Sequence, residues 1–377
     1  MRIAQLANFY APASGGLRTT LDALGRGYVA AGHDRLLVVP GARYARVRDA
    51  AGGVRVTVPG PRVGGGYRMV LSPGVLLGLR RLLGWFAPDV LEVSDKLTLV
   101  GTARWARARG VRTVLLSHER LDAILAPRLP GRLPPVRAVD AWNRCLAGAF
   151  DAVVAASAFS GAEFARLGGQ VALHRVPLGV DLEVFAPAGA RGDGVRLVYA
   201  GRLSAEKWPH LPLGALAVLR RRGVDARLDV LGDGPERGRL ERWAATAGLP
   251  VRFHGHVAER RGVAAVLARA DVALVPCAVE SFGLSALEAL ACGTPVVTAD
   301  RGAARELVVP GAGAVAPAGC ATGMADAVTR VLARPEEVRR AAARARAEEF
   351  PWARTVERML AVHANAGRAD CGPPGVR

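Results

Sequence analysis

Residues 270–307 read ADVALVPCAVESFGLSALEALACGTPVVTADRGAAREL and contain one complete strand-helix-strand unit. The apolar run at 272–276 predicts a short buried strand, and 284–291 predicts an apolar helix. The sequence Gly-Thr-Pro at 293–295 ends that helix before a second apolar strand at 296–298. This order of elements is typical of a parallel sheet and therefore predicts an α/β fold.

Two glutamates lie on either side of the glycine turn that opens this helix. Because the helix begins just after Gly283, the amides of Phe282, Gly283 and Leu284 can donate to a phosphate at its positive end. Glu280 precedes the helix and suits sugar hydroxyls, while Glu288 lies about one turn into it and suits a ribose diol. Alternatively, Glu288 is a solvated helix residue and Glu280 an acid favoured by the helix dipole. Together with the flanking strands, the two glutamates favour a nucleotide-sugar site.

Four motifs carry a resemblance to a known family. Glu280 and Glu288 resemble the E-x7-E signature of the retaining, family 4-like glycosyltransferases, which have two facing Rossmann-like domains and a cleft between them (the GT-B fold). The other motifs are YAGRLSAEK at 199–207, which resembles GRL-x-x-EK, LGDGP at 231–235, and VPLGVD at 176–181, which resembles PNGVD.

Three N-terminal segments are most similar to the actinobacterial GDP-mannose-dependent alpha-mannosyltransferases that act on glycolipids. These segments are ANFY at 7–10, SDKLTL at 94–99 and SHERLD at 117–122. The resemblance covers nearly the whole chain, and it implies GDP-mannose as the donor and a lipid-linked acceptor.

The chain has 377 residues, which suits two domains that each bury a core. A linker is predicted at 185–194, where Pro187 and three glycines interrupt the apolar pattern. The expected domains are an acceptor-binding Rossmann-like domain at 1–185 and a nucleotide-sugar-binding one at 186–351. The resemblance implies that a terminal helix within 352–370 crosses back to the first domain.

In the first domain, polar or glycine-rich motifs follow predicted strands, at the sheet edge where open parallel sheets bind ligands. Glycines let backbone amides approach a bound diphosphate without an intervening side chain. The residues expected there are Gly16 after the strand at 2–7, Asp95 and Lys96 after the strand at 90–93, and His118 and Arg120 after the strand at 113–117.

The resemblance assigns roles to these residues. It implies that His118 contacts the transferred sugar, although a lone histidine can also cap a loop or pack neutral under it. Asp95, Lys96 and Arg120 are expected to bind the acceptor.

In the second domain, Arg202 and Lys207 are predicted to bind the donor diphosphate, the guanidinium gripping two oxygens and the ammonium acting as a point charge. The alternative is an ion pair with Glu206 or another acid. Val257 follows a predicted strand where backbone groups contact the base, and the sequence leaves guanine and uracil both open.

Catalysis requires stabilisation of the negative charge that develops on the leaving diphosphate. His118, Arg202, Lys207 and Glu280 are the predicted catalytic residues, and no Asp-x-Asp motif indicates a metal. The resemblance implies that no divalent cation is needed and that anomeric configuration is retained. A hydrolase pair of Glu280 and Glu288 is rejected, because Glu288 belongs to the nucleotide side of the ligand.

The formal net charge of +18 indicates an anionic partner, and a membrane surface fits better than nucleic acid because the chain lacks nucleic-acid-binding motifs. The apolar segment 74–88, with Arg80, Arg81 and Trp85, suits a headgroup layer, as does the loop with Arg128, Arg132 and Arg137. Alternatively, Trp85 and the leucines of 74–88 form a core face.

The five cysteines show no metal-ligand or CxxC spacing. The short apolar N-terminus predicts a strand rather than a signal peptide. We therefore expect a cytoplasmic enzyme at the inner face of the plasma membrane that transfers mannose from GDP-mannose to a lipid-linked acceptor. The alternatives are a UDP-sugar-dependent transferase with a soluble acceptor, and a non-catalytic protein that binds nucleotide or nucleic acid.

Overall fold

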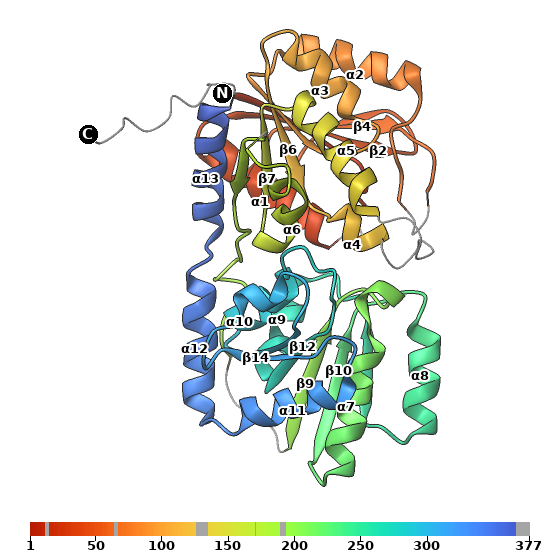
Figure 1. Cartoon of the computed structure of the whole chain (residues 1–377), viewed down its shortest axis with the longest axis vertical. Coiled ribbons are helices and arrows are strands. Elements are labelled where there is room, and N and C mark those ends of the chain that lie inside the picture. The colour runs from red at the N-terminus through yellow and green to blue at the C-terminus, as the bar shows by residue number, and fades with distance from the viewer. Residues whose placement is uncertain (12–14, 64–66, 126–134, 170, 189–193, 367–377) are drawn as a thin grey trace, which may run out of the picture. The chain divides into compact units, whose positions relative to one another are not determined.

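The computed structural model describes residues 1–11, 15–63, 67–125, 135–169, 171–188 and 194–366 (Figure 1). The chain forms two compact units, each an α/β unit with its own parallel sheet. The first unit comprises Met1–Pro177 and Trp352–Arg377, and the second comprises Leu178–Pro351. The predicted linker at 185–194 thus lies within the second unit, and its residues 189–193 lie outside the described residues.

The first unit contains an eight-stranded sheet of order β3-β4-β2-β1-β5-β6-β7-β8, in which only the β3/β4 pair is antiparallel. Its strands are β1 (Arg2–Ala7), β2 (Asp34–Gly41), β3 (Ala45–Arg48), β4 (Val54–Pro59), β5 (Val90–Ser94), β6 (Arg112–Ser117), β7 (Ala152–Ala155) and β8 (Leu173–Arg175). Its helices are α1 (Gly16–Ala30), α2 (Pro73–Phe86), α3 (Val100–Arg107), α4 (Leu121–Leu125), α5 (Pro135–Ala149), α6 (Ala158–Ala165) and α13 (Trp352–Asn365).

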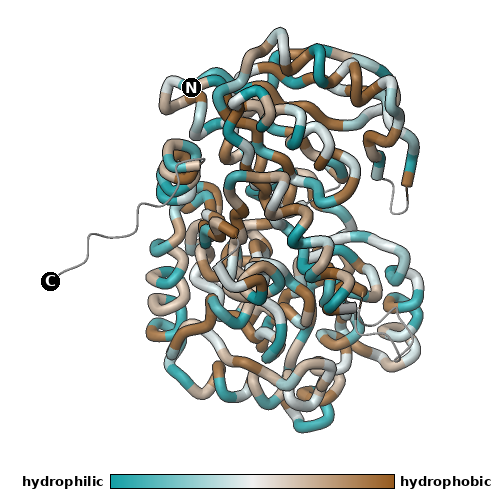
Figure 2. Tube along the Cα trace, turned by 45° about the horizontal axis from the view of Figure 1, so that its top comes forward, coloured by the Kyte–Doolittle hydropathy of each residue, from teal (hydrophilic) through white to brown (hydrophobic). Residues whose placement is uncertain are grey.

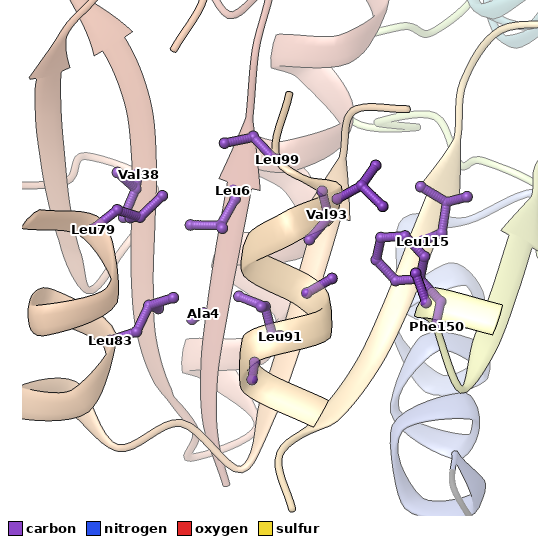
Figure 3. Packing of buried hydrophobic residues seen from close by; sticks show 14 of the residues in the cluster. Ala4, Leu6, Val38, Leu79, Leu83, Leu91, Val93, Leu99, Leu115 and Phe150 are labelled. Atoms are coloured by element: carbon purple, nitrogen blue, oxygen red, sulfur yellow. The ribbon is translucent and has the colours of Figure 1, made fainter. Parts of the chain in front are cut away.

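The core of the first unit forms where helices cover strands that are apolar on both faces. Leu79 and Leu83 lie one turn apart on α2, Leu79 beside Val38 and Leu83 beside Ala4 of the sheet (Figure 3). The alternative that Trp85 belongs to a core face is wrong, because 61% of its surface is exposed. Its position lies off the stripe set by Leu79 and Leu83, because helical neighbours recur at three and four residues.

The β3 strand was not predicted from the sequence. Its sequence, Ala-Arg-Val-Arg, is short and largely exposed, and it pairs antiparallel with β4 at the edge of the sheet. Charged side chains on an edge strand discourage pairing with another chain. Strand propensity and apolar alternation are both weak in such a segment, which explains the omission.

The second unit contains a six-stranded parallel sheet of order β11-β10-β9-β12-β13-β14. Its strands are β9 (Val195–Ala200), β10 (Ala226–Leu231), β11 (Val251–Gly255), β12 (Val272–Val275), β13 (Val296–Ala299) and β14 (Gly313–Ala316). Its helices are η3 (Ala205–Lys207), α7 (His210–Arg221), α8 (Arg237–Thr246), α9 (Arg260–Arg269), α10 (Leu284–Ala291), η4 (Ala304–Leu307), α11 (Ala321–Leu332) and α12 (Glu336–Glu348).

Two glycine-containing loops of the second unit pack directly against each other. Gly201 N donates to Leu231 O at 2.9 Å, and Leu203 N donates to Asp233 O at 3.0 Å. A Cβ added at Gly232, whose φ is 129°, would lie 2.0 Å from Gly201 O. Glycine is therefore required at Gly232 for the loops after β9 and β10 to meet.

Hydrophilic residues recur along the outer helices of both units (Figure 2). Within the described part of the chain, no helix has the length and apolar character needed to span a bilayer.

Candidate active site

The second unit brings two predicted catalytic residues together. Lys207 is the last residue of η3, and its Nζ lies 2.7 Å from Glu280 Oε2. The Lys207 side chain is about one-third exposed and the Glu280 side chain about one-fifth exposed. Burial lowers the pKa of Lys207, but the Glu280 carboxylate outweighs it and holds that pKa above its usual value. Conversely, burial raises the pKa of Glu280, and Lys207 more than offsets this. Both groups are therefore charged at neutral pH.

The Glu280 carboxylate also accepts hydrogen bonds from the amides of Ser281 and Gly283, so it lies at the start of α10. Gly283 is the N-cap residue of α10 with φ at 98°, and a Cβ there would lie 3.1 Å from Ala304 Cβ. A left-handed backbone with so little space favours glycine. This turn fixes the carboxylate relative to the helix start.

Phe282 and Leu284, also predicted as donor contacts, flank this turn. The Phe282 ring is 5% exposed and packs edge-on against Phe350, with the ring centroids 6.3 Å apart. Its side chain is thus part of the core, and only its backbone is suited to a ligand. Leu284 is partly buried as the first residue of α10.

Glu288 lies in α10 and forms an ion pair with Arg260 on α9, with Arg260 Nη2 3.2 Å from Glu288 Oε1. Burial raises the pKa of Glu288 to about 7, although the Arg260 charge acts in the opposite direction. The Arg260 guanidinium also lies 4.9 Å from the centre of the Phe185 ring. Sequence reasoning missed Arg260, because it belongs to no motif in a chain that is rich in arginine.

Arg202 and Val257 follow β9 and β11, the two strands that pair with β10. The Tyr199 hydroxyl donates to Arg202 O at 2.9 Å, which ties the backbone of Arg202 to the end of β9. Val257 follows β11 and is partly buried. Both residues thus lie beyond the carboxyl ends of parallel strands, where such sheets bind ligands.

In the first unit, His118 follows β6 and is partly buried. Its Nε2 lies 3.2 Å from Ser94 Oγ at the end of β5. Burial, and then the Lys96 charge, lower the pKa of His118 to about 4. The imidazole is therefore neutral at pH 7 and can exchange hydrogen bonds with a sugar hydroxyl.

The three predicted acceptor residues make protein contacts. Asp95 Oδ2 accepts from the amides of Leu97 and Leu99 just before α3, at 3.1 and 2.8 Å. Lys96 forms a buried ion pair with Glu163 on α6. Arg120 pairs with Asp122, at 2.7 Å. Acceptor binding by these residues stays a prediction.

Gly16 is exposed and begins α1, while Gly15 is the N-cap residue with φ at −70°. Nothing among the described residues lies within 4 Å of a Cβ built at Gly15. Packing within the described protein therefore does not require glycine at Gly15, which leaves room for a ligand near the amides of this turn.

Glu163, the partner of Lys96, is a second residue at the candidate site that sequence reasoning did not single out. It is a fully buried carboxylate in the helix segment Ala-Phe-Ser-Gly-Ala-Glu-Phe-Ala. The sequence contains a signal for Glu163, because a carboxylate in so apolar a helix needs a cationic partner. The described residues contain no group of three or more His, Cys, Asp or Glu side chains that could hold a metal ion.

The two α/β units, and the contact between Lys207 and Glu280 of two separate motifs, define a glycosyltransferase of the GT-B fold. A family described as "Glycosyl transferase 4-like domain" matches residues 15–179, and one described as "Glycosyl transferases group 1" matches residues 182–348. The chain belongs to the family 4-like, group 1 glycosyltransferases and is a glycosyltransferase.

Relatives and solved structures agree with this assignment. The chain is 46% identical to the GDP-mannose-dependent alpha-(1-6)-phosphatidylinositol dimannoside mannosyltransferase of Mycobacterium tuberculosis, over 99% of this chain and 98% of the relative. It is 31% identical to the corresponding phosphatidylinositol monomannoside mannosyltransferase of Mycolicibacterium smegmatis, over 90% of each chain. Sucrose-phosphate synthase from Thermosynechococcus elongatus shares the fold, with a TM-score of 0.80, 20% identity and coverage of 97% and 98% of the two chains. The predicted family and fold are therefore confirmed.

Proposed function

We propose that the protein transfers mannose from GDP-mannose to a phosphatidylinositol mannoside, with retention of anomeric configuration and without a metal ion. The observation that carries this proposal is the 46% identity to a mannosyltransferase of that donor and acceptor class over 99% of the chain. Similarity across both units, rather than across the donor unit alone, supports the acceptor as well as the donor.

The second unit supplies the groups that the donor needs. Lys207 is a compact cation that can stabilise the diphosphate charge developing as the sugar–oxygen bond breaks, with Arg202 as a second cation. Glu280 accepts hydrogen bonds from mannose hydroxyls, and Glu288 accepts them from the ribose diol. The Lys207–Glu280 contact supports this division of roles, since it places the cation and the sugar-binding carboxylate side by side.

The first unit supplies His118 for the transferred sugar. A pKa of about 4 keeps its imidazole uncharged at neutral pH, so His118 acts in this proposal as a hydrogen-bonding group for a mannose hydroxyl rather than as a cation.

The proposal also includes peripheral association with the cytoplasmic face of the plasma membrane. Leu77 and Trp85 on α2 are 50% and 61% exposed, and Arg81 lies exposed between them. The Arg46 guanidinium of β3 lies 4.8 Å from the Trp85 ring centre, which adds a second cation beside the aromatic ring. Aromatic and aliphatic groups among arginines suit an anionic headgroup layer. Arg137 on α5 is also exposed, while Arg128 and Arg132 lie outside the described residues.

The first test is thermal stabilisation by GDP, UDP and ADP, each with and without EDTA, because a ligand that binds only the folded state raises the melting temperature. We expect stabilisation by GDP that EDTA leaves unchanged. A shift selective for UDP would overturn the donor and favour a UDP-sugar-dependent enzyme. No shift with any nucleotide would contradict the proposed nucleotide-sugar site.

The second test is mannose transfer from GDP-mannose to phosphatidylinositol mannoside in anionic vesicles. Lys207→Ala and Glu280→Ala should each lower kcat by at least about 100-fold, the scale of losing a group that stabilises the transition state. Arg239→Ala is the matched control, because its side chain is 75% exposed and pairs only locally with Glu236. Transfer that survives both active-site changes would refute the assigned site.

A further inference from the structure

A buried ion pair lies beneath the loop that carries His118. Lys96 is 7% exposed and Glu163 is fully buried, and their charged groups are in direct contact. Lys96 is one of only two lysines in a chain that is rich in arginine. The other lysine, Lys207, also pairs with a glutamate.

Both members of the pair also hold the backbone of the loop. Lys96 Nζ donates to Glu119 O at 2.6 Å, and Leu121 N donates to Glu163 Oε2 at 2.9 Å. The ion pair of Lys96 and Glu163 thus binds the loop backbone at residues 119 and 121, immediately after His118. A compact ammonium suits this role, because it can direct its three donors at a carboxylate and a carbonyl together.

Two aromatic residues also contact Lys96, one on α5 and one on α6 next to Glu163. Trp142 Nε1 on α5 donates to Lys96 O at 2.9 Å, and Lys96 Nζ lies 5.1 Å from the centre of the Phe164 ring. The loop is therefore held by contacts from the segment after β5, from α5 and from α6.

A buried ion pair adds little net stability, because desolvation of both charges offsets their attraction. The pair instead specifies position, since either charge alone would be buried without a partner of opposite charge. We propose that Lys96 and Glu163 are positioning residues for His118, and that their ion pair holds the loop 118–121 in the geometry required for sugar transfer. The inference rests on the proposed function, because it takes His118 as the contact to the transferred mannose.

Lys96 also acts on His118 through its charge. After burial, Lys96 is the largest influence that lowers the pKa of His118, while Glu92 on β5 acts in the opposite direction and Ser94 contacts Nε2. The ammonium thus keeps the imidazole uncharged, in addition to fixing the backbone that follows it.

The experiment compares Lys96→Met, Glu163→Gln and the double variant. The double variant leaves no unpaired buried charge, so it tests positioning even where a single variant fails to fold. Arg107→Met is the control, because it removes an ion pair with Asp151 at 2.7 Å elsewhere in the same unit. Each variant is assayed for GDP affinity, kcat and KM for GDP-mannose, and the pKa of His118 by NMR of histidine-labelled protein. The seven histidines allow assignment by comparison with His118→Ala.

We expect GDP affinity within about twofold of wild type, because the proposed GDP contacts Arg202, Lys207 and Glu288 lie in the second unit. We expect a fall in kcat of at least about tenfold for the double variant. Introduced into His118→Ala, the same double change should lower kcat no further, since residues that act through one group are not additive. The pKa of His118 should rise in Lys96→Met and should not rise in Glu163→Gln. If Lys96 and Glu163 only stabilised the fold, the double change would lower kcat further in the His118→Ala background.

A folded double variant with unchanged kcat would overturn the inference, as would an unchanged His118 pKa in Lys96→Met or independent losses in the His118→Ala background. If the wild type fails to transfer from GDP-mannose, the proposed function fails instead. The NMR arm still tests the placement of His118 in that case, because the His118 signal depends on the surroundings of the ring and needs no turnover. An unchanged His118 signal in the double variant would then overturn the inference.

Discussion

At the residue scale, the two glutamates of the E-x7-E motif occupy different electrostatic environments. Glu280 faces Lys207 and two amides, and its pKa lies below the usual value despite burial. Glu288 is also buried, but one arginine does not offset its desolvation, and its pKa rises to about 7. The first is therefore a fixed charge, while the second titrates near neutral pH.

This difference predicts a pH dependence of nucleotide binding. A ribose diol donates to a carboxylate, so GDP prefers the ionised form of Glu288, which becomes more populated as pH rises through about 7. If only that form binds, GDP affinity should increase by up to about tenfold from pH 6 to pH 8. Isothermal titration calorimetry at several pH values measures this change in GDP affinity. Glu288→Gln should bind more weakly and lose this part of the dependence, and an identical profile in that variant would contradict the assignment.

A second prediction concerns the glycine turn before α10. Gly283→Ala places a Cβ at a φ of 98° and 3.1 Å from Ala304 Cβ, so it should lower the free energy of unfolding by about 1–3 kcal/mol. It should also weaken GDP binding, because the helix start shifts. Chemical denaturation and calorimetry measure the two effects.

Gly238→Ala is the matched control for this substitution. Gly238 lies within α8, and an added Cβ there meets only the Arg242 guanidinium at 3.6 Å. Alanine is the better helix former, so Gly238→Ala should leave stability unchanged or raise it by up to about 1 kcal/mol. Equal destabilisation by both changes would refute the strain at Gly283.

At the element scale, α12 holds the helices of the donor site through arginines. Arg340 donates to Ala268 O and Ala270 O near the end of α9, and to Cys292 O and Gly293 O after α10. Arg344 donates to Ala291 O, the last residue of α10. The last carbonyls of a helix have no intrahelical donor, so these guanidiniums satisfy groups that burial would otherwise leave unpaired.

The same helix joins α10 to the segment that precedes β9, because Arg344 Nη1 also donates to Phe185 O at 2.9 Å. Arg344→Ala should therefore lower the free energy of unfolding of the second unit by about 2–3 kcal/mol, since several carbonyls lose a charged donor. Urea denaturation followed by Trp fluorescence measures the loss.

Arg222→Ala is the control for Arg344→Ala. Arg222 forms an ion pair with Asp326 at 2.7 Å, but both side chains are more than two-fifths exposed. Water screens such a pair, so the change should cost less than about 1 kcal/mol. A similar cost for both variants would show that α12 does not support the site.

At the scale of the whole molecule, α13 belongs to the first unit although it follows the second unit in the sequence. Val356 and Met359 of α13 join the core that contains Ile3 and Leu24. The contact is also polar, because His363 Nε2 lies 2.7 Å from Glu92 Oε1 and both side chains are fully buried. Residues 271 positions apart in the chain thus form one interaction.

Glu92 is the centre of this polar cluster. The Tyr28 hydroxyl and Gln5 Nε2 also donate to its carboxylate, at 2.5 and 2.7 Å. Burial raises the pKa of Glu92, but His363 and these donors together hold it below the usual value. The resulting stabilisation is present above the pKa that Glu92 has in the unfolded chain and is lost as pH falls through its lowered folded pKa.

Removing the histidine should therefore loosen the first unit alone. His363→Ala leaves a cavity and removes one partner of a buried carboxylate, which should cost about 3 kcal/mol of unfolding free energy. Hydrogen exchange measured by mass spectrometry should speed up in peptides from β1 and β5 and stay unchanged in β9 and β12. Arg358→Ala, an exposed change on the same helix, should have little effect. Faster exchange throughout both units would contradict this assignment of α13.

The sequence by itself determined the parallel-sheet fold and the local motifs, because these depend on residues close together in the chain. Hydrophobic runs and glycine positions predicted β1 at 2–7 and α10 at 284–291 with the bounds that the structure has. The motif spacing likewise placed Glu280 before α10 and Glu288 within it.

Only the tertiary structure decided which charges meet. Lys207 and Glu280 are 73 residues apart, and Lys96 and Glu163 are 67 apart, so no local period relates them. Arg260 could not be singled out as the partner of Glu288, because dozens of arginines offer the same chemistry and only the packing of α9 against α10 selects one. Burial and pKa follow from that packing, since desolvation and charge proximity are properties of three-dimensional position.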